Sequence, residues 1–361
     1  MLKWGIDLTV RAPTRTVPGE LALIKTIRGQ ANRAGRGIGA LRLGIGDDCA
    51  VLRPRAGFEI CVTTDFSLEG RHFLRELHAP ESAGHRCLAR GLSDLAAMGA
   101  EPLAVFLSLA VPSELPARWI ERFLSGLLAL ARKHRIPLAG GDTAESPVPE
   151  GARGGLIVAD IVAVGQVPRG KAVQRSGARP GDALYVTGGL GGAAGELLAA
   201  REQPERFRSP TRAAPGHPHF YPEPRLAVGY RLRALAHAMI DISDGLSTDL
   251  THLCRESGVA AAIEEAALPI DPRTALLSWR PREPVDMALH GGEDYELLFA
   301  AAGTGVPRRI AGVPIHRIGT LRRARRGEPL IVVRDPEGKR IRVEPRGFEH
   351  FRQGARGNDQ I

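Results

Sequence analysis

The segment GIGDDCAVL at residues 44–52 opens a series of short acidic motifs that decides the fold class. In each motif an apolar run reaches an aspartate that adjoins Gly, Ser or Thr. The later motifs are VTTDFSLEG (62–70), LSDLAAMGA (92–100), AGGDT (139–143) and IDISDGL (240–246). The aspartates concerned are Asp47, Asp48, Asp65, Asp94, Asp142, Asp241 and Asp244. Because the motifs separate alternating strand-like and helix-like segments, they indicate an α/β protein.

The same order of segments occurs twice along the chain. Strand patterns at residues 57–65, 101–112 and 154–167 are interspersed with helical spacing at 81–99 and 114–134. After a polar segment rich in Gly and Pro come a strand at 182–188, helices at 192–200 and 225–237, a strand-like segment at 291–300 and a hairpin at 329–344. We therefore predict domains at 18–167 and 168–352, with a flexible extension at 1–17 and a flexible tail at 353–361.

The aspartates point to a divalent cation. Mg²⁺ prefers hard oxygen ligands and usually takes a few carboxylates together with substrate phosphates and water. An aspartate at the tip of a strand can reach a shared cleft, and a neighbouring Gly lets a phosphate approach the backbone. Any single motif could instead be ordinary turn or N-cap chemistry. Seven aspartates brought together would repel one another, and a cation would relieve that repulsion.

The composition excludes several classes of protein. The four cysteines, Cys49, Cys61, Cys87 and Cys254, form no C-x-x-C pair, which argues against a disulfide framework or a zinc ribbon. The longest apolar run, residues 102–112, is too short to span a bilayer, so we expect a cytoplasmic protein with no membrane partner. The net charge of +9 would suit nucleic acid, but the arginines are spread along the chain and rarely adjoin aromatic residues. We therefore expect no nucleic-acid partner.

Two glycine-rich segments are similar in sequence to known nucleotide-binding loops. The stretch from Gly165 to Ala172 nearly matches the P-loop, but Ala172 lacks the hydroxyl that would bind Mg²⁺ and Pro168 has no N–H for a phosphate. The stretch from Gly189 to Ala194 follows a strand and opens a helix, as a dinucleotide fingerprint does. The acid expected about 20 residues later falls in a polar loop, so a packing or phosphate-proximal turn fits better.

The motifs together resemble those of the thiamine-monophosphate kinases. The similarity extends over residues 18–351 and includes TTDFSLEGRHF (63–73), LSDLAAMGAEP (92–102), QRSGARPGD (174–182), DISDGLSTDL (241–250) and GGEDYEL (291–297). It implies an N-terminal ATP- and Mg²⁺-binding domain whose mixed sheet pairs into a barrel across a homodimer. It also implies a C-terminal α/β domain that covers the cleft.

The resemblance also implies site residues, motif by motif. The implied ligands of several Mg²⁺ ions are Asp48, Thr63, Thr64, Asp65, Asp94, Asp142, Asp241 and Asp244, and Asp47 matches the first acid of its pair. The implied ATP contacts are Gly141, Asp142, Arg175 and Ser243. The implied contacts to thiamine monophosphate are His72, Glu293 and Phe348. Arg71 and Arg346 depart from the family pattern near these substrate residues.

The reaction implied is attack of a thiamine-monophosphate oxygen on the γ-phosphorus of ATP, which yields thiamine diphosphate and ADP. A phosphomonoester has a second pKa of about 6, so its oxygen is ionised at neutral pH and no side chain is required as an acid or base. Mg²⁺ and Arg175 would stabilise the transferred phosphoryl group. Two alternatives stay open: an enzyme similar to aminoimidazole ribonucleotide synthetase, and a non-catalytic basic protein that binds nucleotides or RNA.

Overall fold

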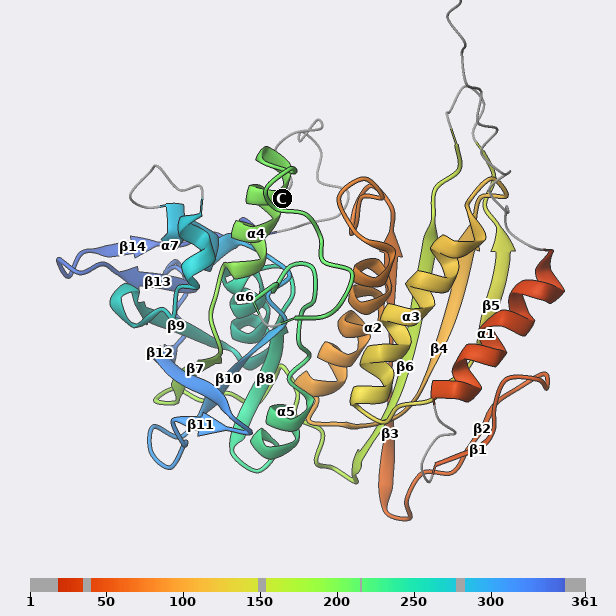
Figure 1. The fold of residues 1–361 in the computed structure, drawn as a ribbon. Helices are drawn as coiled ribbons and strands as arrows, with labels where there is room; N and C mark the ends of the chain where they lie inside the picture. The colour runs from red at the N-terminus through yellow and green to blue at the C-terminus, as the bar shows by residue number, and fades with distance from the viewer. Residues whose placement is uncertain (1–18, 35–39, 149–153, 215, 277–282, 348–361) are drawn as a thin grey trace, which may run out of the picture.

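The computed structural model describes residues 19–34, 40–148, 154–214, 216–276 and 283–347. The predicted extension at 1–17, Phe348 and the predicted tail lie outside these residues. The described chain forms a two-domain mixed α/β fold, with the two domains side by side in Figure 1. No helix in the described part of the chain is long and apolar enough to cross a membrane.

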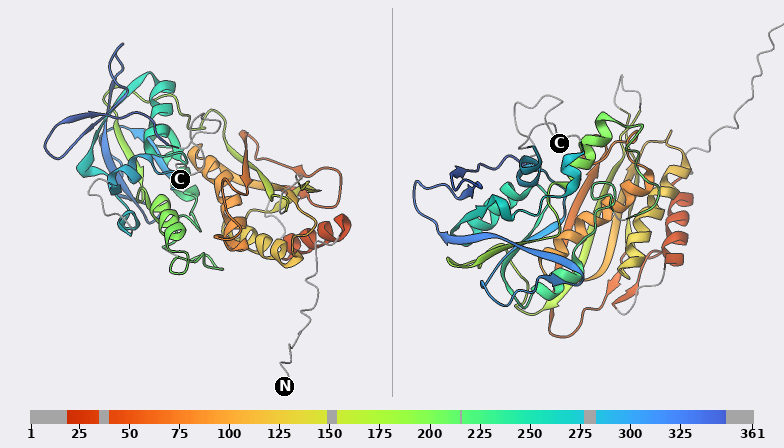
Figure 2. Two further views of the ribbon diagram at one scale, coloured as in Figure 1. Left: turned by 90° about the horizontal axis from the view of Figure 1, so that it is seen from above. Right: turned by 60° about the vertical axis from the view of Figure 1, so that its left-hand side comes forward.

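The first domain has a four-stranded sheet with helices on one face (Figures 1 and 2). Its elements are α1 (Glu20–Ala34), β1 (Leu41–Leu43), β2 (Val51–Leu52), β3 (Phe58–Leu68), α2 (Pro80–Ala97), β4 (Glu101–Val111), α3 (Ala117–Lys133), β5 (Leu138–Glu145) and β6 (Val158–Pro168). The strand order is β3-β6-β4-β5, and β1 and β2 form a separate pair. The predicted strands at 57–65, 101–112 and 154–167 coincide with β3, β4 and β6.

Helix α2 is the centre of the packing. Its apolar side chains are buried around the whole helix rather than along one stripe, which is typical of an element covered on every side. A Cβ on Gly84 would lie 1.9 Å from the carbonyl oxygen of Phe123, so α2 and α3 touch through their backbones. A Cβ on Gly229 would lie 2.0 Å from the carbonyl oxygen of Ala96, which brings the second domain equally close.

The second domain is built on a larger sheet with the order β14-β13-β9-β12-β7-β10-β8, and β11 pairs with β12. Its strands are β7 (Ala183–Thr187), β8 (Ala236–Ile242), β9 (Val259–Glu264), β10 (Glu296–Ala301), β11 (Arg309–Ile310), β12 (Val313–Arg323), β13 (Ile331–Arg334) and β14 (Arg340–Arg342). Its helices are α4 (Gly192–Glu202), α5 (Leu226–Leu232), α6 (Leu246–Ser257) and α7 (Glu283–His290), with 3-10 turns at Glu265–Ala267 and Pro272–Ala275. The hairpin expected at 329–344 is confirmed as β13 and β14.

Two predicted elements differ from the structure. The helix expected at 225–237 ends at Leu232, and Ala236 begins β8, because pairing with β10 takes this apolar segment into the sheet. The strand expected at 291–300 begins only at Glu296. The residues before it cannot extend the strand, since Glu293 and Tyr295 have positive φ angles of 67° and 51°.

Candidate functional site

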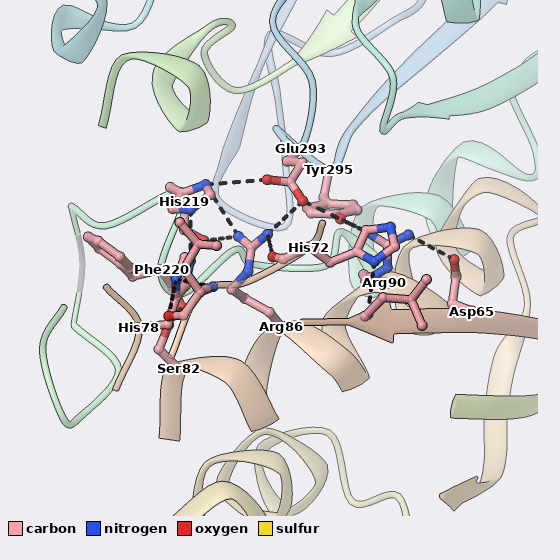
Figure 3. Close-up of polar contacts among 12 residues, drawn as sticks. Asp65, His72, His78, Ser82, Arg86, Arg90, His219, Phe220, Glu293 and Tyr295 are labelled. Atoms are coloured by element: carbon pink, nitrogen blue, oxygen red, sulfur yellow. Dashed lines mark hydrogen bonds and ion pairs between the residues drawn. The ribbon is translucent and has the colours of Figure 1, made fainter. Parts of the chain in front are cut away.

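Two cavities meet at the boundary between the domains. The first, about 320 Å³, is lined by the carboxylates of the motifs and by His72, Leu197 and Glu293, and Asp65 and Glu293 lie on opposite sides of Arg90 in Figure 3. The second, about 710 Å³, lies beside the start of β3 and includes Arg175 in its wall. Asp94 and Asp241 line both cavities. Two ligands that occupied the two cavities would therefore meet at these two carboxylates.

The carboxylates come from three different elements. Alternation along β3 turns Asp65 toward α2, which carries Asp94, while β8 supplies the buried Asp241. Thr63 Oγ1 donates a hydrogen bond to Asp94, and Ser93 Oγ donates to Asp241 over 2.7 Å. The expectation of an aspartate at a strand tip is wrong for Asp65, which lies inside β3, whereas Asp94 lies in α2, within the helix predicted at 81–99.

Burial and mutual repulsion make Asp65 and Asp241 hard to ionise. Desolvation and the neighbouring Asp94 raise the pKa of Asp65 to about 6, although Arg90 opposes the shift. Desolvation and Asp94 likewise raise the pKa of Asp241 to about 7. Burial disfavours the charged form of each carboxyl, and a neighbouring carboxylate adds to the effect.

The donor set fits Mg²⁺ that is shared with a phosphate ligand. Asp65, Asp94, Asp241 and Asp244 offer hard oxygens along one wall of the first cavity. Within the described ranges, no three His, Cys, Asp or Glu side chains surround one point as a complete metal site. Because Mg²⁺ usually keeps water and substrate oxygens among its ligands, a few carboxylates suffice.

At the other side of the first cavity, Glu293 belongs to a buried polar network (Figure 3). Arg86 Nη2 donates to Glu293 Oε1 over 2.6 Å, and His219 Nδ1 lies 3.3 Å from Glu293 Oε2. Burial acts to raise the pKa of Glu293, but Arg86, His219 and Arg90 outweigh it and hold the pKa well below its usual range. Glu293 is therefore an ionised carboxylate in the cavity wall.

The two histidines of this network contact each other and their neighbours. His78 Nδ1 lies 3.1 Å from the Leu74 backbone nitrogen and 3.2 Å from the Leu74 carbonyl oxygen, and His78 Nε2 lies 3.0 Å from His219 Nε2. His219 Nδ1 lies 3.3 Å from Glu293 Oε2 and 3.4 Å from Arg86 Nη1. Burial lowers the pKa of both rings, to about 4 for His219, which keeps them neutral.

Arg86 joins this network to the second predicted substrate residue. It donates to the backbone oxygens of His219 and His72, the latter over 3.0 Å. The Leu68 N–H donates to His72 Nδ1 over 2.9 Å, so a neutral His72 carries its proton on Nε2. One buried guanidinium thus fixes residues from the 69–74 loop, the 216–225 loop and the segment before β10.

The other predicted residues fall into two groups. Arg175 lines the second cavity, and Ser243 and Asp244 line the first. The second group lines neither cavity and lies on the 44–50 loop, on β5, or on the outward face of β3. Its members are Asp47, Asp48, Gly141, Asp142 and Thr64, of which all five are exposed. Figure 1 shows β1, β2 and β5 on the side of the first sheet away from β8.

The sequence analysis missed four residues of the site: His78, Arg86, Arg90 and His219. Arg86 and Arg90 are spaced four residues apart in a helix whose middle is otherwise mostly apolar, a pattern that predicts buried partners. That spacing could have identified the two arginines from the sequence. Nothing in the sequence could have identified His78 and His219, because each is an isolated residue in a loop or just before a helix.

Comparisons with known proteins show the family to which the chain belongs. The family model for the AIR synthase related protein, N-terminal domain, matches residues 46–167, and that for its C-terminal domain matches residues 179–320. The thiamine-monophosphate kinase of Escherichia coli K12 is 35% identical over 316 residues, which cover 86% of this chain and 92% of the relative.

Solved structures similar to this chain include thiamine-monophosphate kinases. The thiamine-monophosphate kinase of Stenotrophomonas maltophilia K279a is 37% identical, with a TM-score of 0.72 and coverage of 90% of this chain and 98% of the other. A structure described as AaThiL complexed with AMPPCP and TMP is 27% identical, with a TM-score of 0.68 and coverage of 92% and 97%. On the strength of these matches, the chain belongs to the thiamine-monophosphate kinase family.

Proposed function

We propose that this chain transfers the γ-phosphoryl group of ATP to thiamine monophosphate, which yields thiamine diphosphate and ADP. The observation that carries the proposal is the pair of cavities that share Asp94 and Asp241. A nucleotide in the larger cavity, beside Arg175, would direct its phosphates toward an acceptor in the smaller one. The related complex with AMPPCP and TMP holds one ligand of each kind.

The acceptor end of the first cavity suits a thiamine group. Thiamine carries a cationic thiazolium and an aminopyrimidine, which favour an ionised acid and a hydrogen-bonding partner nearby. Glu293 is held ionised there, and His72 lies in the same wall. These two residues, with Phe348 as a third that lies outside the described ranges, would select the organic part of the acceptor.

The chemistry requires positioning and charge neutralisation rather than a general base. The acceptor phosphate is already largely ionised at neutral pH. The side chains would hold donor and acceptor in line, exclude water and place Arg175 against the nucleotide phosphates. Asp65, Asp94, Asp241 and Asp244, with Thr63, would hold Mg²⁺, which when bound neutralises the phosphate oxygens.

We also propose a homodimer in which a second copy completes the site. Asp48, Thr64, Gly141 and Asp142 lie away from the two cavities of their own chain, so they could join a site only across a subunit boundary. The outward face of β3 supports this arrangement, because Ile60, Val62 and Phe66 are 46%, 61% and 59% exposed in a continuous row. A barrel formed with the partner's sheet would cover them.

We take residues 18–167 and 168–352 as the two domains.

The decisive experiment measures ADP release by the purified protein with Mg²⁺ and ATP. Thiamine monophosphate, free thiamine and aminoimidazole-type precursors would be compared as acceptors. We expect release with thiamine monophosphate alone, and formation of thiamine diphosphate in equal amount. Release with free thiamine but not with its monophosphate would refute the proposed acceptor.

A further inference from the structure

Arg90 lies between the two sides of the first cavity. It is on α2, one turn after Arg86, and its guanidinium is placed between Glu293 and Asp65 in Figure 3. Its side chain is 17% exposed, whereas Arg71 and Arg201 in the same cavity wall are exposed. An acceptor that joined the carboxylate side to the Glu293 side would have to pass this guanidinium.

The contacts of Arg90 are loose for a largely buried arginine. Nη1 donates to Tyr295 Oη over 3.1 Å, Nη2 lies 3.3 Å from Asp65 Oδ1, and Nη1 lies 3.8 Å from Glu293 Oε1. Arg90 Nε is buried without a hydrogen-bond partner among the described residues. A buried N–H in this condition is costly, so the site favours a ligand that can accept from it.

Arg86 offers a contrast on the same helix. Its Nη2 lies 2.6 Å from Glu293, and two backbone oxygens accept further hydrogen bonds from its Nη groups. Both Nη groups of Arg86 are therefore paired within the protein, although its Nε, like that of Arg90, is buried without a partner among the described residues. Arg90 faces three acceptors without forming a close bidentate pair with any of them.

We propose that Arg90 binds the phosphate of the acceptor, a use of the site that rests on the proposed function. A guanidinium matches a phosphomonoester because its planar fork can donate two parallel hydrogen bonds to two phosphate oxygens. In Arg90 such a pair would use the unpartnered Nε together with Nη2, which would exchange its 3.3 Å contact with Asp65 Oδ1 for the phosphate. The cation also compensates a dianion that would otherwise enter a space bordered by Asp65, Asp94, Asp241 and Glu293.

The test is isothermal titration of the full chain with thiamine monophosphate and with thiamine, in Mg²⁺ buffer without nucleotide. For Arg90→Met we expect affinity for thiamine monophosphate to fall roughly 10- to 100-fold, and affinity for thiamine to change less than about threefold. Arg90→Lys should recover part of the loss, because it restores charge without the fork. Arg122→Met, which removes an exposed ion pair with Glu81, is the matched control and should leave both affinities unchanged.

Titration with a non-hydrolysable ATP analogue tests whether each variant still has an intact cleft between the domains. We expect Arg90→Met to retain its nucleotide affinity. A parallel loss of nucleotide affinity in Arg90→Met and Arg90→Lys would overturn the inference, since Arg90 would then support the whole cleft. If Arg90→Met binds thiamine monophosphate as tightly as the wild-type protein does, the inference is refuted and the proposed function is not affected. Absence of that binding in the wild-type protein would refute the proposed function, and the inference with it.

Discussion

Replacement of Arg86 by methionine should be among the most destabilising single changes in the molecule. Arg86 is 3% exposed, and its removal takes one donor from each of the backbone oxygens of His72 and His219 and from the carboxylate of Glu293. Breaking a buried ion pair costs about 3–5 kcal/mol, and each orphaned acceptor adds roughly 1–3 kcal/mol before relaxation. Because Glu293 is partly open to the cavity, we expect a total loss of about 4–6 kcal/mol in the free energy of unfolding.

A double-mutant cycle separates the charge from the packing. In the Arg86→Met background, Glu293→Gln removes the uncompensated carboxylate and should return roughly 1–2 kcal/mol. In the wild-type background the same change should be destabilising, because it leaves Arg86 and His219 facing a neutral amide.

The free energy of unfolding would be measured by urea denaturation, followed by far-UV circular dichroism. Arg122→Met breaks an exposed pair on the same domain, in which Arg122 is 44% exposed, and should cost less than about 1 kcal/mol. The reasoning fails if Arg86→Met costs no more than Arg122→Met, or if Glu293→Gln has the same sign of effect in both backgrounds.

Three further predictions concern the site, the pH dependence and the assembly. Asp65→Asn should lower the rate of ADP release by at least about 100-fold with an unchanged circular dichroism spectrum, and near-normal turnover would contradict its assignment as a Mg²⁺ ligand. Burial lowers the pKa of His85 from 6.5 to about 4, so it contributes about 3 kcal/mol of stability that is present above pH 6.5 and lost as the pH falls toward 4. His85→Gln should therefore reduce the difference between urea midpoints at pH 7.5 and pH 5, and an unchanged difference would exclude this source. Phe66→Asp should convert a dimer to a monomer in sedimentation velocity, whereas a wild-type monomer would refute the assembly.

Several elements of the first domain could be predicted from the sequence because their patterns are local, whereas β1, β2 and β5 were not predicted. Strands such as β3 and β4 show apolar runs bounded by turn residues, and α3 buries one stripe of side chains. Strand β8 could not be predicted, because a mostly apolar segment of seven residues after a helix can continue the helix or form a strand. Only its pairing with β10 decides between the two.

The site was only partly predictable, because its geometry depends on sheet order. Of the seven aspartates in the motifs, Asp65, Asp94 and Asp241 are neighbours in the structure, whereas the order β3-β6-β4-β5 places Asp142 on the edge strand opposite β3. The partnership of Arg86 with His219 joins residues 133 positions apart. No local spacing reveals such a contact, which arises only when the two domains pack on α2.

The close approaches of α2 have a consequence for how the molecule can be divided. One continuous apolar core includes Leu88 and Leu92 from α2 together with Leu232 and Phe299 from the second domain. Helix α2 also touches the backbone of α3 on one side and that of α5 on the other. Residues of each domain therefore form part of the hydrophobic core of the other. A fragment cut at the boundary near residue 168 would expose that shared surface to water, so we expect neither half to be an autonomous folding unit.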